Sequence, residues 1–178
     1  DEPILWWAPQ KRMVVVPQHY TMHKSMHNIF NRKIFDITFN KDFYQVITTC
    51  KNIYRRDQQG TWISDEIVEA YTRLHEMGLA RSVEVWQNKK LVGGLYGVDI
   101  GNGIFCGESM FSKVSNASKV AFYTLLQDLK EKDYLLLDCQ VYNEHLESLG
   151  AYEILRSEYM KYLLEGNIRL RIKKMKAS

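Results

Sequence analysis

The fold is decided by residues 81–110, which read RSVEVWQNKKLVGGLYGVDIGNGIFCGESM. Within residues 81–87, the apolar side chains of Val83 and Val85 alternate with the polar side chains of Ser82 and Glu84. The later runs 91–99 and 104–110 are mostly apolar, as buried strands are. Short polar segments at 88–90 and 101–103 separate the runs and are typical of tight turns. The stretch therefore predicts three consecutive strands that form an antiparallel meander.

Helices are predicted around this meander. Apolar residues at helical spacing predict one helix over 41–51, and Ser64 as a cap with Gly78 as a stop predicts a second. A third follows Ser115 or Asn116 and ends near 130–132, before a strand at 134–141. Three antiparallel strands, a helix and a further strand form the core order of an N-acyltransferase (GNAT-like) fold. We therefore expect an α+β protein with a mostly antiparallel mixed sheet flanked by helices.

Composition excludes several classes of protein. The 178 residues suit one ordinary globular domain, and the net charge is only +3, so the chain is not a globally basic nucleic-acid binder. The basic residues of 167–176 form a tail that we expect to be solvated and disordered. No run is long enough to cross a membrane and no signal peptide is visible, which favours the cytoplasm. The three cysteines have no metal-binding spacing and are expected to be buried thiols.

Two carboxylates stand out as candidate catalytic groups. Glu108 and Asp138 each interrupt an apolar run, where a buried charge costs several kcal/mol, on the order of 5, unless it is compensated. Gln140 follows two residues after Asp138, so the two side chains are expected to share a strand face. From the residues alone, structural hydrogen bonds at strand ends explain both carboxylates equally well.

A series of motifs, in order along most of the chain, resembles the bacterial leucyl/phenylalanyl-tRNA–protein transferase family. The segments that carry the resemblance include Pro3–Trp7, Gly60–Ile63, Ser82–Trp86, Leu91–Val98, the Glu108 and Asn116 segments, Asp138–Gln140 and His145–Ala151. The resemblance implies an aminoacyltransferase that moves Leu or Phe, with Met as a further donor, from aminoacyl-tRNA to the N-terminal Arg or Lys of acceptor proteins and so tags them for degradation. It implies no cofactor, and we expect a monomer.

The resemblance also implies roles for individual residues. Glu108, Asp138 and Gln140 match the active-site residues of the family, in which both a Gln–Asp proton relay and a positioning role have been argued. The implied site for the donor side chain consists of Leu95, Phe105, Met110, Phe122, Leu125 and Leu137. The implied tRNA contacts are Trp62, which would stack on the terminal adenine, and Lys24, Arg32 and Lys33 on the backbone. Sequence alone favours plain packing for the apolar residues and for Trp62.

The same resemblance suggests a division of the chain. Residues 1–35 are assigned to the remnant of an N-terminal subdomain with tRNA contacts, 36–164 to the GNAT-like catalytic domain and 165–178 to the basic tail. The sequence departs from the family at Arg81, where His is common. His19, His23 and His27 lie four apart and predict one helix face after Pro17, which favours contact with RNA over a metal site.

Two alternatives to the transferase remain open at this point. A coenzyme-A-dependent N-acyltransferase of the same fold would need a glycine-rich pyrophosphate loop, which Ser112–Lys119 does not supply. A non-catalytic tRNA-binding module would not require the combination of Glu108, Asp138 and Gln140.

Overall fold

The computed structural model describes residues 8–53 and 61–177, so the Pro3–Trp7 motif and Gly60 lie outside the described residues. The elements, in chain order, are β1 (Lys11–Val15), the 3-10 turn η1 (Pro17–His19), α1 (Lys24–Asn31), β2 (Asp36–Phe39), α2 (Phe43–Asn52), α3 (Asp65–Glu76), β3 (Ala80–Gln87), β4 (Lys90–Asp99), β5 (Ile104–Ser112), α4 (Ala117–Glu131), β6 (Leu136–Gln140), α5 (Glu144–Ser148), β7 (Tyr152–Leu155) and α6 (Arg156–Ala177).

The described strands form one seven-stranded sheet in the order β2-β3-β4-β5-β6-β1-β7. All neighbouring strands are antiparallel except β5 and β6, which run parallel because α4 connects them. The predicted meander is β3, β4 and β5, and Asn88 and Lys89 at its first turn have φ values of 51° and 60°, as a type I′ hairpin requires. The predicted mixed, mostly antiparallel sheet is confirmed.

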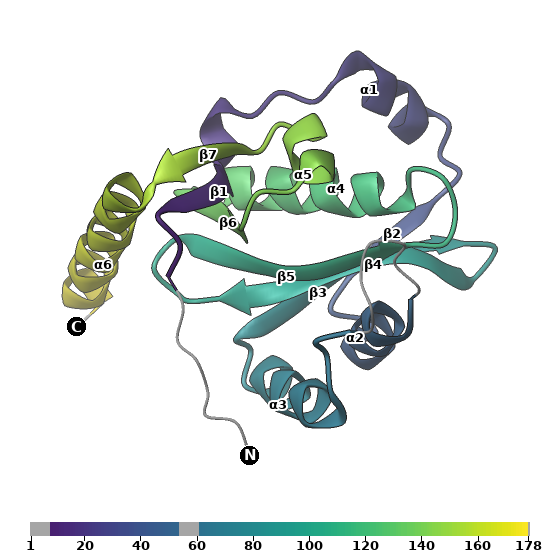
Figure 1. The fold of residues 1–178 in the computed structure, drawn as a ribbon, viewed down its shortest axis with the longest axis horizontal. Helices are drawn as coiled ribbons and strands as arrows, with labels where there is room; N and C mark the ends of the chain where they lie inside the picture. The colour runs from purple at the N-terminus through teal and green to yellow at the C-terminus, as the bar shows by residue number, and fades with distance from the viewer. Residues whose placement is uncertain (1–7, 54–60, 178) are drawn as a thin grey trace.

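Helices cover both faces of this sheet. Figure 1 shows α4 and α1 on one side, α2 and α3 on the other, and α6 beside the β7 edge. The largest buried cluster lies between the sheet and α4, and a second lies between the sheet and the pair α2 and α3. A third cluster joins β1, β6 and β7 to the inner face of α6 through Tyr159, Tyr162 and Leu163.

Gly93 on β4 has no side chain, and this allows α4 to pack close to the sheet. A Cβ atom added to Gly93 on β4 would lie 2.5 Å from the Cβ of Ala117, at the first turn of α4. The equivalent atom on Gly107 of β5 would meet only ordinary contacts, at 3.6 Å and 3.8 Å. Gly93 therefore lets α4 lie close to β4, where it supplies side chains to the cavity described below.

Gly93→Ala is expected to destabilise the protein by roughly 1–3 kcal/mol, because overpacking at this contact forces α4 away from the sheet. Urea unfolding measures the loss, with Gly107→Ala as the matched control on the neighbouring strand. The control is expected to change the free energy of unfolding by less than about 1 kcal/mol, because its added Cβ atom meets only ordinary van der Waals contacts. Equal losses in the two variants would contradict the account of this contact.

Four short or unusual elements were not predicted from the sequence, namely β2, α5, β7 and α6. The segment after Pro17 was expected to be one helix, which is wrong: His19 lies in η1, His23 precedes α1 and only His27 lies within it. The three histidines therefore do not share one helix face. Helix α4 begins at Ala117 with Asn116 as its N-cap residue, one of the two that were predicted, but the side chain that accepts from the first turn is the hydroxyl of Ser112, 3.1 Å from the backbone N of Ser118.

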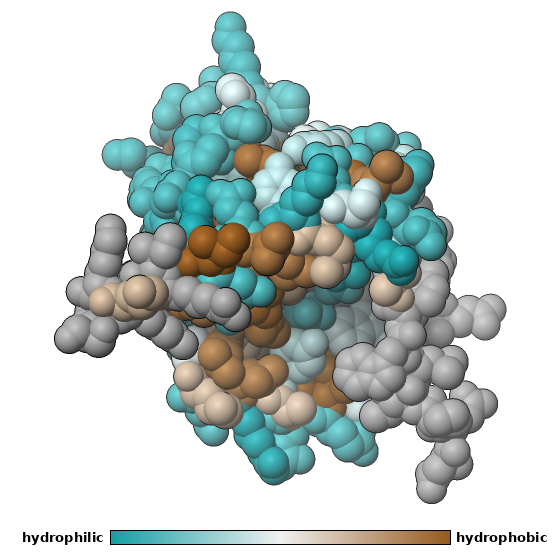
Figure 2. Space-filling view, turned by 90° about the vertical axis from the view of Figure 1, so that its left-hand side faces the viewer, coloured by the Kyte–Doolittle hydropathy of each residue, from teal (hydrophilic) through white to brown (hydrophobic). Residues whose placement is uncertain are grey.

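Helix α6 also corrects the expectation for the basic tail. The helix runs to Ala177, so the tail is helical and not disordered. The outer face of α6 and the end of β7 expose apolar side chains, which Figure 2 shows as a brown patch on this face of the molecule; they include Leu155, Met160, Leu164 and Ile168. Among the described residues, no helix is both long enough and apolar enough to cross a membrane.

Candidate active site

A cavity of about 440 Å³ opens where β5 and β6 meet α4 and α5. Its walls combine apolar side chains with a few polar groups, a combination typical of small-molecule sites. The residues that line it are Trp62, Leu95, Tyr96, Gly107, Glu108, Ser109, Met110, Phe122, Leu125, Leu137, Cys139, Gln140, Val141, Tyr142, Asn143, His145 and Leu146. Residues from five separate elements therefore converge on one space.

Five of the six predicted slot residues line this cavity, and Phe105 does not. Phe105 is fully buried, and the guanidinium of Arg81 lies 5.8 Å from the centre of its ring. A Cβ atom added to Gly97 on β4 would lie 2.5 Å from the ring of Phe105, so this ring packs over Gly97, beneath Arg81, and is not part of the cavity wall. Phe105 therefore belongs to the core.

Among the described residues that line the cavity, Glu108 is the only carboxylate. It accepts hydrogen bonds from the amide Nε2 of Gln140 at 3.3 Å and from the hydroxyl of Tyr71 on α3. Burial raises the pKa of Glu108, although the hydrogen bonds from Gln140 and Tyr71 partly oppose this effect. A carboxylate with a raised pKa beside an apolar cavity is well suited to accept a proton near neutral pH.

Asp138 is fully buried and does not line the cavity. Its carboxylate accepts from Arg12 on β1 in a forked arrangement, Nε to Oδ1 at 3.0 Å and Nη2 to Oδ2 at 2.8 Å. The hydroxyl of Tyr159 on α6 donates to Oδ2 at 2.8 Å. Burial alone would lower the pKa of Arg12, but the hydrogen bond and charge of Asp138 outweigh it and raise that pKa. Arg12 and Asp138 therefore form an ion pair deep in the sheet.

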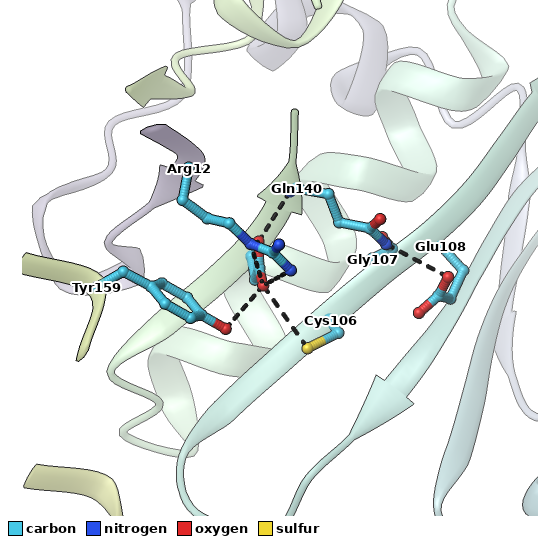
Figure 3. A network of polar contacts seen from close by, with 7 residues as sticks. Arg12, Cys106, Gly107, Glu108, Gln140 and Tyr159 are labelled. Atoms are coloured by element: carbon cyan, nitrogen blue, oxygen red, sulfur yellow. Dashed lines mark hydrogen bonds and ion pairs between the residues drawn. The ribbon is translucent and has the colours of Figure 1, made fainter. Parts of the chain in front are cut away.

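Gln140 connects the two carboxylates. Its backbone N–H donates to Oδ1 of Asp138 at 2.8 Å, and its φ of 69° ends the regular strand at this residue. The side-chain Nε2 then reaches across to β5, where it donates to the carbonyl oxygen of Gly107 at 2.9 Å as well as to Glu108. Figure 3 shows Gln140 and Glu108 pointing toward one another, with Arg12, Tyr159 and Cys106 on the other side of the network. Gln140 therefore contacts both of the other predicted residues: its backbone N–H bonds to Asp138, and its side-chain amide bonds to Glu108.

The family model described as leucyl/phenylalanyl-tRNA protein transferase matches residues 14–164. The transferase of Flavobacterium johnsoniae is 60% identical over 162 residues, which are 91% of this chain and 76% of the relative. That of Flavobacterium psychrophilum is 56% identical over the same shares of the two chains. The chain belongs to the leucyl/phenylalanyl-tRNA–protein transferase family. The predicted family and enzyme class, an aminoacyltransferase, are confirmed.

Solved structures support the fold of this transferase. A conserved protein of unknown function from Bacteroides thetaiotaomicron aligns with a TM-score of 0.56 and 12% identity, over 78% of this chain and 53% of that one. An aminoglycoside acetyltransferase from an uncultured soil metagenomic sample aligns with a TM-score of 0.50 and 12% identity, over 67% and 86%. The predicted GNAT-like fold is confirmed.

The transferase has two thiols at the site, and neither is poised as a nucleophile. Cys106 contacts Oδ2 of Asp138 at 3.9 Å, and Cys139 lines the cavity. Both residues are partly exposed, whereas the sequence predicted buried thiols. Burial, with the charge of Asp138, raises the pKa of Cys106 to about 12 and also raises that of Cys139. Because the thiolate is the reactive form, both side chains are unreactive at neutral pH.

The implied tRNA contacts lie apart from one another. Trp62 lines the cavity and is 47% exposed, so part of its side chain is accessible for stacking on a base. Lys24 begins α1, while Arg32 and Lys33 follow its last turn, and all three are exposed. They are not among the residues that line the cavity, whereas Trp62 is.

Sequence reasoning missed three residues of the transferase site: Arg12, Tyr71 and Tyr159. Tyr71 lies among partly buried apolar residues of α3 that pack on the core, and Arg12 lies at the start of the short strand β1, so neither is marked by its neighbours in sequence. Arg81, which departs from the family, forms a separate ion pair with Asp128 on α4 at 2.6 Å. Arg81 therefore supports the packing of α4 and takes no part in the cavity.

Proposed function

We propose that this cavity holds the aminoacyl end of Leu-tRNA or Phe-tRNA and that the enzyme transfers the aminoacyl group to the N-terminal Arg or Lys of an acceptor protein. The observation that carries the proposal is the joining of an apolar floor to a carboxylate, Glu108, that accepts a hydrogen bond from the amide of Gln140. The floor suits a Leu, Phe or Met side chain. The product would carry the added residue as a tag for degradation.

The reaction needs few catalytic groups. The acceptor α-amine attacks the ester carbonyl, a C–N bond forms, and the bond to the ribose oxygen breaks. The amine loses a proton and the ribose oxygen gains one, so the overall step consumes no cofactor. An α-amine with a pKa near about 8 is mostly protonated at neutral pH, so a nearby proton acceptor is required.

The position of Glu108 supports this role. Its carboxylate lines the cavity, while that of Asp138 is buried behind Arg12 and Tyr159. The amide of Gln140, held between Gly107 and Glu108, can orient the reacting groups. Asp138 is already neutralised by Arg12, so Glu108 also supplies the negative charge that attracts a cationic N-terminal residue.

The start of α4 does not favour the coenzyme-A alternative. A pyrophosphate bound at a helix N-terminus needs free backbone N–H groups there. The N–H of Ala117 donates to the carbonyl of Val114 at 3.3 Å, and that of Ser118 donates to Ser112. The close approach of Gly93 and Ala117 fills the remaining space. The aminoacyl-tRNA reaction is therefore the better fit.

The size of the apolar floor is expected to set donor preference. Leu125→Val is expected to raise the ratio of Phe to Leu transfer roughly tenfold, because removing a methylene from the cavity wall leaves room for the larger ring. Competition between labelled Leu-tRNA and Phe-tRNA measures this ratio. Leu126→Val is the matched control, since Leu126 is equally buried on α4 but faces the core and not the cavity. An unchanged ratio in Leu125→Val, or the same change in both variants, would contradict the assignment of the floor.

The proposed function is tested by mixing the enzyme with Leu-tRNA and peptides that begin with Lys, Arg or Ala, and by offering acetyl-coenzyme A in parallel. Labelled leucine is expected on the Lys and Arg peptides only, and no acetyl group on any peptide. Acetyl transfer, or transfer that ignores the N-terminal residue, would refute the proposal.

A further inference from the structure

The carboxylate of Asp138 has no exposed surface, and besides the weak contact of the Cys106 thiol it accepts hydrogen bonds from β1, β6 and α6. Arg12 donates from β1 to both carboxylate oxygens, Tyr159 donates from α6 to Oδ2, and the backbone N–H of Gln140 donates to Oδ1. A carboxylate held in this way cannot touch an acceptor amine in the cavity. Its effect on the reaction has to pass through a neighbour.

That neighbour is Gln140. A φ of 69° is rarely adopted by a residue with a side chain, and it persists only where the surroundings impose it. The bond from the N–H of Gln140 back to Asp138, two residues earlier, is a local bond of the kind that stabilises such a turn. With the backbone turned, the amide of Gln140 reaches the carbonyl of Gly107 and the carboxylate of Glu108.

We propose that Arg12 and Tyr159 are positioning residues of the transferase, which fix the carboxylate of Asp138 and through it hold the amide of Gln140 against Glu108 in the cavity. The inference rests on the proposed function for its effect on rate. Its structural part, the coupling of Tyr159 to Gln140, is measurable without any reaction. Figure 3 shows the geometry, with Arg12 and Tyr159 approaching from different elements and Gln140 beyond them.

The surroundings of Tyr159 allow a clean test. Tyr159→Phe removes one hydroxyl and keeps the ring, whose centre lies 5.2 Å from the guanidinium carbon of Arg12. Tyr162, one turn further along α6, packs against the same cluster, and its hydroxyl is not among the donors to Asp138. Tyr162→Phe therefore removes the same atom from the same helix and serves as the matched control. Arg12→Lys is a second variant, which keeps the charge and loses the forked geometry.

We expect Tyr159→Phe to lower kcat for transfer about tenfold and leave KM for Leu-tRNA and for the acceptor peptide unchanged. The expectation follows because the lost bond to a charged group alters the orientation of Gln140 and not the apolar or tRNA contacts. Arg12→Lys is expected to lower kcat at least as much. Tyr162→Phe is expected to retain the kcat of the wild type. A merely structural role would lower the yield of folded enzyme and leave kcat per folded molecule intact.

The coupling itself is read by NMR on protein labelled with ¹⁵N at glutamine. The backbone and side-chain amide signals of Gln140 are expected to shift in Tyr159→Phe and Arg12→Lys and to stay in place in Tyr162→Phe. Unmoved Gln140 signals, or an unchanged kcat in an active enzyme, would overturn the inference. A wild-type chain that transfers nothing would refute the proposed function and the effect on rate, whereas the signals of Gln140 would still decide whether the coupling exists.

Discussion

Glu108→Gln lowers the rate of aminoacyl transfer by about a hundredfold or more in our account and raises the stability of the folded enzyme at neutral pH. The rate falls because glutamine keeps the size and hydrogen-bonding reach of the side chain but cannot accept the proton of the acceptor amine, a loss that typically costs at least about 100-fold. Single-turnover transfer from Leu-tRNA to a peptide that begins with Lys measures it. Unchanged tRNA binding in the same variant would show that the loss is chemical.

Glu108→Gln is expected to raise stability, although it lowers the rate, because a buried carboxylate is costly to ionise. Burial raises the pKa of Glu108 in the folded protein, so the folded state holds its proton to a higher pH than the unfolded state does. Stability is therefore lost as pH rises through the window between the ordinary pKa and the raised one. Glutamine carries no such penalty, and we expect it to add roughly 1 kcal/mol, or about 2–4 °C in Tm, at neutral pH.

This gain has its own control in pH. Below the ordinary pKa of a glutamate, the side chain is protonated in both states, and the difference in Tm between wild type and Glu108→Gln should vanish. Thermal unfolding followed at several pH values measures the difference. A gain that is independent of pH, or a variant that is less stable at neutral pH, would show that burial does not destabilise the ionised form of Glu108.

Asp138→Ala is expected to destabilise the protein by about 3 kcal/mol or more, the largest loss that we predict. Removing this carboxylate leaves the guanidinium of Arg12 partly buried without its partner and removes the acceptor for Tyr159 and for the N–H of Gln140. Breaking one side of a buried pair typically costs about 3–5 kcal/mol, and the partial exposure of Arg12 places the expectation at the lower end. Urea unfolding at neutral pH measures the loss.

Lys11, which precedes Arg12 on β1, forms an exposed ion pair that serves as the control for this prediction. Lys11 pairs with Glu153 at 3.2 Å, and its side chain is 60% exposed. Because an exposed pair contributes little, Lys11→Ala is expected to cost less than about 1 kcal/mol. Similar losses for Lys11→Ala and Asp138→Ala would mean that the buried network does not stabilise the sheet as described.

The central sheet was predictable because its evidence is local. The alternating run of β3, the apolar runs of β4 and β5, and the turn residues between them are neighbours in sequence. Glu108 and Asp138 were visible for the same reason, since each interrupts an apolar run. By contrast, β2 and β7 are edge strands of four residues, too short to show a period of two.

Helix α6 escaped prediction because it is apolar on two faces. Its inner residues, such as Tyr159 and Leu163, pack against the sheet, while Leu164 and Ile168 lie on the exposed side. Two apolar faces do not produce the single stripe by which an amphipathic helix is recognised. The sequence therefore gave no strong periodic signal in this segment.

The network around Asp138 could not be read from the sequence for a different reason. Arg12 is 126 positions away from Asp138 and meets it only because β1 lies beside β6 in the sheet. Gln140 was expected to share a strand face with Asp138, but its left-handed backbone directs its side chain to β5. The residue type of Phe105 suited the cavity, but its ring packs over Gly97 on the neighbouring strand β4, a contact that the sequence does not show.

The central claim is that the cavity beside Glu108 and Gln140 holds the aminoacyl end of the donor. Its most direct test is the crystal structure of the enzyme with leucine joined to 3′-amino-adenosine through a stable amide. Our account predicts the leucine side chain against Phe122 and Leu125, the carbonyl beside Gln140 and Glu108, and the adenine at Trp62. Density for this compound at any other place on the protein, with the cavity empty, would contradict the claim.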